Sequence, residues 1–434
     1  MATDNHDPEQ SKEFYFRRNV ALIPPVDLFW GFGVAVTALG PILAVFLLQL
    51  GASNFLIGFL PVAALLGSSL LQLPSAHLTR HLRRKQVFFA LSHLPPCAAL
   101  IIAGLLAPRY AVGHPRTMIW VLLGMVAAFS AANGLLMPIW TQLFPRMFAD
   151  TRRGLIGGMI VAMSGTGGLV GGLYAAHVLA NRPFPFNYAH LFILAGVLEL
   201  ISVQAYAFGH EEIPREPPEE TPHLLHSLRV LWGEDRRLRR FLFVRSLSEV
   251  GLAASAFFAV YATKRWGLPP STGGTFVIAM SLGSATTGLL GGRLGDRRGY
   301  RRVMGWALGC SAVATLLALL SRDPRWFYPA FFLLGAGVSG DWMSSTNLLI
   351  EMAPEERRAY YYAMFSTAMA PARLIAPLAW GWLGDSVGLP WVFAGGLALQ
   401  IAGMALLLAL VDDPRRPGQR LLRWRWGSWA PRLY

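Results

Sequence analysis

Long apolar stretches alternate with short polar segments along most of the chain. A helix needs about 20 mainly apolar residues to cross the hydrocarbon core of a bilayer. Twelve stretches reach this length, at residues 26–50, 54–74, 87–107, 117–141, 155–179, 188–209, 241–263, 271–292, 302–321, 326–350, 360–385 and 389–411. The pattern predicts an all-α membrane protein with twelve transmembrane helices.

The composition supports this fold class. Apolar residues make up 54% of the 434 residues and charged residues 14%, whereas soluble domains carry about 25% charged residues. The two cysteines, Cys97 and Cys310, both lie in apolar runs. A disulfide scaffold and a cysteine-rich metal site are therefore excluded.

The basic residues predict the orientation. With the N-terminus inside, 29 of the 38 Lys and Arg residues fall in inside segments, 7 fall in outside segments, and Arg245 and Arg373 fall within spans. Lys and Arg concentrate in cytoplasmic loops, so we expect both termini in the cytoplasm and the protein in the plasma (inner) membrane. The net charge of +14 then reflects loops that face anionic lipid, and no nucleic-acid partner is expected.

The chain contains an internal repeat. A shift of 216 places residues 51–86 on residues 267–302, with Gly51 on Gly267 and Gly58 on Gly274. Six-plus-six repeats occur in transporters that bind substrate between two bundles. The predicted parts are a cytoplasmic segment (1–25), a six-helix bundle (26–209), a cytoplasmic linker (210–240), a second six-helix bundle (241–411) and a basic aromatic tail (412–434).

The loop between the eighth and ninth spans carries a recognisable motif. Its sequence, GGRLGDRRGYRR at 291–302, resembles the signature loop G-x-L-(A/G)-D-R-x-G-R-(R/K) of the major facilitator superfamily, with Tyr300 where Arg or Lys is common. The matching positions are Gly292, Leu294, Gly295, Asp296, Arg297, Gly299 and Arg301. The resemblance implies alternating access, with this loop as a cytoplasmic gate. The first-half copy has Arg80 and Arg83 in place of its acidic residue and glycine.

Charged residues within spans are costly and mark candidate functional sites. Arg245 and Glu249 lie four residues apart and share a helix face. At about 1.5 Å per residue, Glu249 lies about 12 Å, Asp341 about 14 Å and Arg373 about 20 Å from the cytoplasmic ends of their spans. We expect Arg245 to lie nearer the cytoplasmic surface than Glu249. One hypothesis is a substrate and proton site; the alternative is two structural ion pairs, Arg245–Glu249 and Asp341–Arg373.

Other polar residues are weaker candidates. Glu199 lies in the middle of the sixth span without a partner within a turn, so we expect its carboxyl to be protonated. It is either a proton carrier or a neutral, hydrogen-bonded structural residue. Asn133 and Asn347 need partners in hydrocarbon and can face the substrate path. Asp27 and Asp385 lie at span ends, where water can solvate them, and are discounted as substrate ligands.

The fifth span bears on the direction of transport. Gly154, Gly167, Gly171 and Gly172 fit four glycines of the motif G-x8-G-x3-G-P-x2-G-G found in the antiporter branch of the superfamily. The alternative is ordinary packing of small residues. The fourth span has Ser130-x-x-Asn133-Gly134 and lacks the arginine of the R-x-x-Q-G motif common in proton antiporters.

The sequence contains no Walker loop and no HExxH zinc motif, so we expect neither a cofactor nor a metal, and no enzymatic activity. The leading hypothesis is a monomeric secondary transporter that exports an amphipathic compound, coupled to protons. A second hypothesis is uptake or facilitated diffusion of a polar or anionic metabolite. A third is a sensor or lipid-handling protein on the same fold, since fold does not settle function.

Overall fold

The structure is a computed structural model that describes residues 8–79, 82, 84–148, 153–212, 232–233, 235–354 and 357–413. Within these ranges every regular element is a helix and no strand occurs, which confirms the all-α class. Arg80 and Arg83 of the first-half loop lie outside the described residues, as do most of the predicted linker and tail.

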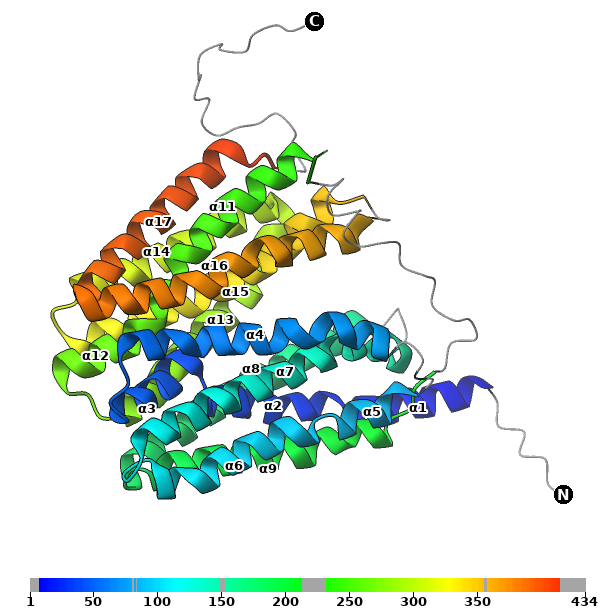
Figure 1. Ribbon diagram of the computed structural model, residues 1–434. Coiled ribbons are helices and arrows are strands. Elements are labelled where there is room, and N and C mark those ends of the chain that lie inside the picture. The colour runs from blue at the N-terminus through cyan, green and yellow to red at the C-terminus, as the bar shows by residue number, and fades with distance from the viewer. Residues whose placement is uncertain are drawn as a thin grey trace, which may run out of the picture.

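The helices before residue 212 gather in one part of the molecule, here called the N-terminal half (Figure 1). They are α1 (Pro8–Leu22), α2 (Pro24–Val36), η1 (Leu39–Leu43), α3 (Ala44–Gln49), α4 (Asn54–Leu78), α5 (Lys85–Leu91), α6 (Leu94–Tyr110), α7 (Pro115–Met147), α8 (Arg153–Asn181), α9 (Phe186–Val203) and η3 (Gln204–Phe208).

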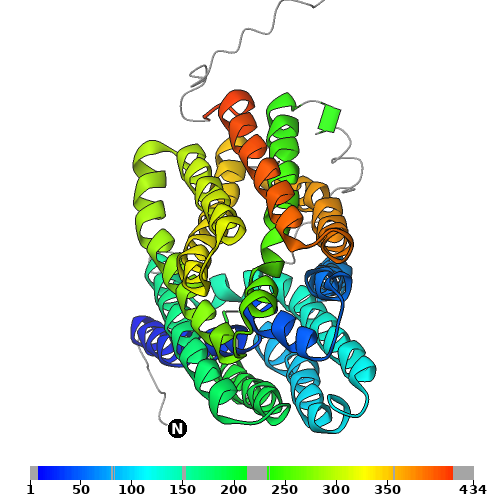
Figure 2. The ribbon, with the colours of Figure 1, turned by 90° about the vertical axis from the view of Figure 1, so that its left-hand side faces the viewer.

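The helices after residue 235 form the second group, here called the C-terminal half, which lies above the first in Figure 2. They are α11 (Arg236–Leu252), η4 (Ala253–Phe257), α12 (Phe258–Trp266), α13 (Ser271–Arg298), α14 (Tyr300–Leu320), η5 (Pro324–Trp326), α15 (Phe327–Met352), α16 (Arg358–Ser386) and α17 (Leu389–Leu410).

Nine helical segments among the described residues are long and apolar enough to cross a membrane. They correspond to nine of the twelve predicted spans. The other three, 54–74, 326–350 and 360–385, are helical as α4, α15 and α16 but do not belong to these nine. Twelve crossings and cytoplasmic termini therefore remain predictions.

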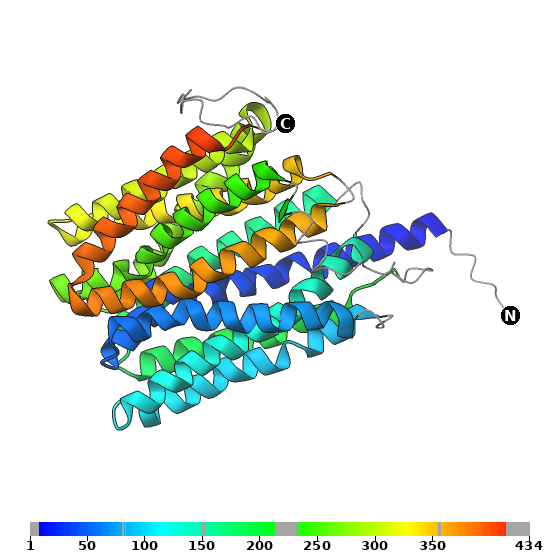
Figure 3. The ribbon, with the colours of Figure 1, turned by 45° about the horizontal axis from the view of Figure 1, so that its top comes forward.

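The helices run between two ends of the molecule. α1 projects from one end, and α17 finishes toward that same end, whereas the turn between α3 and α4 lies at the opposite one (Figures 1 and 3). We call the first the inner end, because the basic loops predict it to be cytoplasmic, and the other the outer end.

The two halves meet mainly through two pairs of helices, α4 with α16 and α8 with α13, and also where α12, α13 and η4 contact η1. The internal repeat appears in the backbone as well. Gly51 and Gly267, which the shift of 216 aligns, both have positive φ, 78° and 62°. Each follows a helix at the outer end and needs the left-handed conformation that glycine adopts at little cost. The repeat is therefore one of structure as well as of sequence.

Each half has, at the inner end, an acidic side chain at the start of a helix, a contact that the sequence did not predict. Glu211 Oε2 accepts the backbone N–H groups of Lys85 (2.7 Å) and Gln86 (3.1 Å) at the start of α5. In the other half, a Cβ placed on Gly299, the residue before α14, would lie 2.9 Å from Asp413 Oδ2. An acid that follows the last helix of each half thus lies at the positive N-terminus of a helix. The sequence signal is an acidic residue just after the sixth and the twelfth apolar stretch.

Candidate functional site

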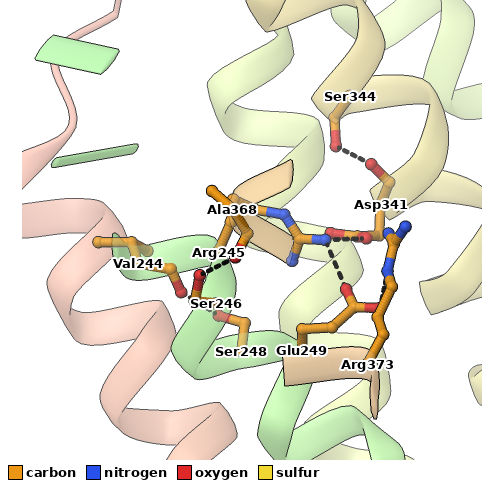
Figure 4. A network of polar contacts seen from close by, with 9 residues as sticks. All are labelled: Val244, Arg245, Ser246, Ser248, Glu249, Asp341, Ser344, Ala368 and Arg373. Atoms are coloured by element: carbon orange, nitrogen blue, oxygen red, sulfur yellow. Dashed lines mark hydrogen bonds and ion pairs between the residues drawn. The ribbon is translucent and has the colours of Figure 1, made fainter. Parts of the chain in front are cut away.

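Four charged side chains from three helices of the C-terminal half meet in one network (Figure 4). Arg245 Nη2 donates to Asp341 Oδ2 at 2.7 Å and to Glu249 Oε2 at 3.1 Å. Arg373 Nε donates to Glu249 Oε1 at 2.8 Å. The bonds run in the order Asp341, Arg245, Glu249, Arg373, so two acids and two bases balance in charge.

The structure corrects one expectation about this network. The side chain of Arg245 is 1% exposed, the most buried of the four, although Arg245 lies one turn nearer the start of α11 than Glu249. The expected ion pair between Asp341 and Arg373 is replaced, because Arg245 binds Asp341 and Arg373 binds Glu249. Only the expected pair of Arg245 with Glu249 forms. Instead of two separate pairs, the four side chains make one connected network.

The network joins α11, α15 and α16. Arg245 and Glu249 lie one turn apart on α11, so both side chains extend from one face of that helix. Asp341 comes from α15 and Arg373 from α16. Next to the network, Ser246 Oγ donates to the backbone oxygen of Ala368 at 3.5 Å, which ties α11 to α16 a second time.

Arg373 lies on the face of α16 that is turned toward the N-terminal half. Pro377 and Gly381 follow it at intervals of one turn and so share its face. A Cβ on Gly58 of α4 would clash with the Pro377 backbone oxygen, and one on Gly381 would lie 2.6 Å from the Asn54 oxygen. Arg373 therefore lies one turn inward from the place where α16 and α4 cross closely. Its side chain is 37% exposed.

A carboxylate closes the outer end of this crossing. Asp385 Oδ1 accepts the backbone N–H of Asn54 at 2.8 Å, and Oδ2 accepts that of Phe55 at 2.9 Å. Lys264 of α12 donates to the Asn54 side chain at 3.0 Å. Asp385 is exposed at the end of its span, as expected, and it also joins the two halves at the positive N-terminus of α4. The sequence gives no sign of this long-range contact.

The glycines of the fifth span pack against two different helices. A Cβ on Gly167 would clash with the Leu28 oxygen of α2, and one on Gly171 would lie 2.8 Å from the Phe32 oxygen. A Cβ on Gly172 would lie 2.9 Å from Ile278 of α13, across the boundary between the halves. Gly154 is the second residue of α8, far from these contacts along the helix.

The remaining predicted polar residues lie outside the network. Glu199 of α9 is 4% exposed, and both of its carboxyl oxygens are buried without a hydrogen-bond partner in the described part of the chain. Its carboxyl lies against Gly33 of α2, where a Cβ would clash with it. Asn133 and Asn347 donate to backbone oxygens of their own helices, those of Phe129 (3.1 Å) and Met343 (2.8 Å). The structure does not bring these three together with the four charged residues.

The signature loop, residues 291–302, is mostly helical: it forms the last turns of α13, the single residue Gly299 and the start of α14 at the inner end. Tyr300 donates its hydroxyl to Asp296 at 2.9 Å, and a Cβ on Gly295 would clash with its ring. The tyrosine that departs from the family motif is thus anchored to two residues that match it. Gly299 has a φ of 89°, and Arg301 donates to the Leu408 oxygen at 2.8 Å. Among the other motif residues, Arg297 is exposed, and the space beside Gly292 is open.

Comparison with known proteins places these features in a family. The family model described as Major Facilitator Superfamily matches residues 28–263 and 241–432. An uncharacterized MFS-type transporter of Mycobacterium tuberculosis is 30% identical over 140 residues, 32% of this chain and 24% of that protein. A Na⁺, Li⁺, K⁺/H⁺ antiporter of Planococcus maritimus is 27% identical over 179 residues, 40% of this chain and 41% of that protein. The aligned parts thus span less than half of either relative.

Solved structures match over nearly the whole chain. The nucleoside transporter NupG superposes with a TM-score of 0.71 at 13% identity, covering 92% of this chain and 100% of that one. A bacterial homologue of the iron transporter ferroportin, in an inward-facing state, gives 0.68 at 16% identity, covering 91% and 98%. The D-xylose-proton symporter gives 0.67 at 14% identity, covering 92% and 99%. At these identities the likeness shows a shared fold.

Proposed function

Because the chain belongs to the major facilitator superfamily, we propose that its network of Asp341, Arg245, Glu249 and Arg373 couples transport to protons. The chain is a multi-pass membrane protein and a secondary transporter of a small molecule, and it is not an enzyme. The proposal concerns how it works: the two halves rock about this network and expose it to one side of the plasma membrane at a time.

One observation carries the proposal: a single buried guanidinium, that of Arg245, binds the carboxylates of Glu249 and Asp341 at once. Removing one partner from a buried charged pair costs about 3–5 kcal/mol, because the other charge is left uncompensated. A proton that binds either carboxylate cancels one negative charge, so the contacts of Arg245 and Arg373 must rearrange. Protonation thereby alters how α11, α15 and α16 are held together.

Contacts between the halves support alternating access. At the outer end Asp385 joins α16 to α4, and Gly172 of α8 packs closely on α13. Both contacts lie across the boundary that must open if the site is to face outward. The signature loop at the inner end is the proposed gate of the opposite state, with Asp296, Arg297 and Arg301 as its charged residues.

Two directions of transport each have an observation in their favour. Gly172, which packs closely on α13, is one of four glycines that match the antiporter motif, and one relative is named as a cation/proton antiporter. These likenesses favour the first candidate, proton-coupled export. The exposed side chain of Arg373 favours the second candidate, uptake of a polar or anionic metabolite.

The proposal can be tested before the substrate is identified. Purified protein is reconstituted into liposomes loaded with the pH dye pyranine, and a panel of metabolites, organic anions and apolar cations is added outside. A transported compound should change the internal pH in wild-type liposomes. Glu249→Gln and Asp341→Asn should abolish that change, whereas Asp323→Asn, at the start of η5, should keep it. A compound that still moves protons in both network variants contradicts the proposal.

A further inference from the structure

Arg373 is the exposed cation of the network. Its side chain is 37% exposed, against 16% for Glu249, 12% for Asp341 and 1% for Arg245. The Nε group of Arg373 donates to Glu249. The two Nη groups of Arg373 have no hydrogen bond to any residue that the structure describes. A guanidinium presents five N–H donors in a planar fork that fits a carboxylate or phosphate. Arg373 therefore has donors that an entering anion can reach, whereas the side chain of Arg245 is buried.

The position of Arg373 fits a ligand that enters between the halves. It shares a face of α16 with Pro377 and Gly381, which contact Gly58 and Asn54 of the N-terminal half. Phe257 of η4 is fully buried and lies 3.4 Å from the Cβ that Gly58 lacks, so the crossing is also covered from the C-terminal half. A ligand on Arg373 would therefore lie against a tightly packed outer crossing.

On the basis of the proposed function, we propose that the substrate is an organic anion, which binds Arg373 and is carried in the same direction as a proton on Glu249. The proton comes from water and adds to the Glu249 carboxylate, which becomes a neutral carboxyl and loses its attraction for Arg373. The anion then takes the place of that carboxylate at the guanidinium. No covalent bond to the substrate forms or breaks.

Charge balance determines the direction of the coupling. The network itself carries two positive and two negative charges, and an unbalanced charge within a membrane-spanning helix is costly. An anion bound alone adds a negative charge beside Glu249. An anion bound with a proton leaves the network neutral. A cationic substrate would instead compete with the proton for a carboxylate, and the two would be exchanged.

The neighbouring acid is less suited to this exchange. Asp341 binds the most buried cation of the four, Arg245, at 2.7 Å. Glu249 lies between the two guanidinium groups and bonds Arg373 directly. A proton on Glu249 therefore frees Arg373 at once, whereas a proton on Asp341 acts on Arg373 only through Arg245 and Glu249. This difference assigns Glu249 as the residue that links proton and anion binding.

Calorimetry on purified protein in detergent tests the inference directly. Benzoate, octanoate and succinate serve as anionic probes, with benzyl alcohol and benzylammonium as neutral and cationic analogues of benzoate. Titrations at one pH in two buffers of different ionisation enthalpy count the protons taken up on binding. At least one anion should bind the wild type with uptake of about one proton, as linkage between the two sites requires. Neither benzyl analogue should bind.

Two variants separate the roles of the residues. Arg373→Gln should weaken anion binding at least tenfold, and Arg322→Gln, outside the network, should leave it unchanged. Glu249→Gln should bind the anion at least as tightly as the wild type, with no proton uptake, because a neutral side chain already faces Arg373. A merely structural Glu249 would instead give weaker binding and unchanged proton uptake in this variant.

Other results would overturn the inference, and each of them also shows whether the proposed function survives. Binding of none of the three anions, or anion binding without proton uptake in the wild type, rules out the inference. Binding of benzylammonium with proton release, lost in Glu249→Gln, points to cation exchange: the inference then fails and proton coupling through the network survives. Should the pyranine assay detect no proton movement while anions still bind Arg373, proton coupling fails and the anion site stands.

Discussion

The carboxylate of Asp385 accepts the backbone N–H of Asn54 at 2.8 Å, and this bond links the last turn of α16 to the first turn of α4. The second oxygen of Asp385 binds the next N–H, that of Phe55, at 2.9 Å. These bonds cross the boundary between the halves. The outer end can open only if they break.

Replacing Asp385 by Ala should loosen the outer end. Hydrogen bonds to a charged group contribute about 1.5–3 kcal/mol, so their loss shifts the equilibrium toward states with the outer end open. Spin labels on Val112 and Val387, exposed residues of the two halves near that end, should move apart in Asp385→Ala. Asp323 supplies the control, because it also accepts a helix-start N–H (Arg325, 2.7 Å) but within its own half. Equal distances in Asp385→Ala and the wild type would show that the contact does not hold the halves together.

Removing Arg245 should strongly destabilise the fold. The change Arg245→Met leaves Asp341 without its guanidinium and Glu249 with only one. The expected loss is about 3–5 kcal/mol of unfolding free energy, measured by denaturant unfolding in detergent. Arg109→Met, on an exposed position of α6, should change the stability by less than about 0.5 kcal/mol. A loss in Arg245→Met no larger than in that control would mean that the network contributes little to folding.

The glycines of α8 offer a matched pair. A Cβ on Gly167 would clash with the Leu28 oxygen, whereas one on Gly165 would have no atom within 4 Å. Gly167→Ala should therefore cost about 1–3 kcal/mol by forcing α2 and α8 apart. Gly165→Ala should be neutral or stabilising by up to about 1 kcal/mol, since alanine favours a helix. Thermal unfolding of both variants checks the order, and equal midpoints would contradict the close packing of α8 on α2.

Glu199 and Glu249 should respond in opposite ways to the same substitution. Glu199 has both oxygens buried without a partner among the described residues, whereas Glu249 binds two guanidinium groups. An unsatisfied buried polar group costs about 1–3 kcal/mol, so Glu199→Met should raise the unfolding free energy and Glu249→Met should lower it. If Glu199→Met instead destabilises the protein, the prediction is wrong, and a partner such as a water molecule must hydrogen-bond the Glu199 carboxyl.

Apolar length predicted most of the architecture. Each predicted span corresponds to one helix or to consecutive helical segments, such as α5 and α6 for residues 87–107, because a run of about 20 apolar residues has few alternatives in a bilayer. The family resemblance of residues 291–302 is confirmed by the family match across the chain. The likeness between residues 51–86 and 267–302 reappears as the paired left-handed glycines 51 and 267.

The connections between charged residues were harder to predict. The sequence showed that Arg245, Glu249, Asp341 and Arg373 lie within spans, but depth along a helix does not say which faces meet. A count from the helix end likewise does not show that neighbouring helices bury Arg245. The contact of Asp385 was missed because its partners are backbone N–H groups of a distant helix, which leave no trace in side-chain patterns.

The central claim is that the charge network couples substrate movement to protons, and gradient-driven accumulation tests it most directly. A compound identified in the pyranine screen is supplied to proteoliposomes under an imposed pH gradient, and in parallel to preloaded liposomes without a gradient. Wild-type protein should accumulate it under the gradient. Glu249→Gln should still exchange it in preloaded liposomes but should not accumulate it. Accumulation by Glu249→Gln and Asp341→Asn equal to that of the wild type would contradict the claim.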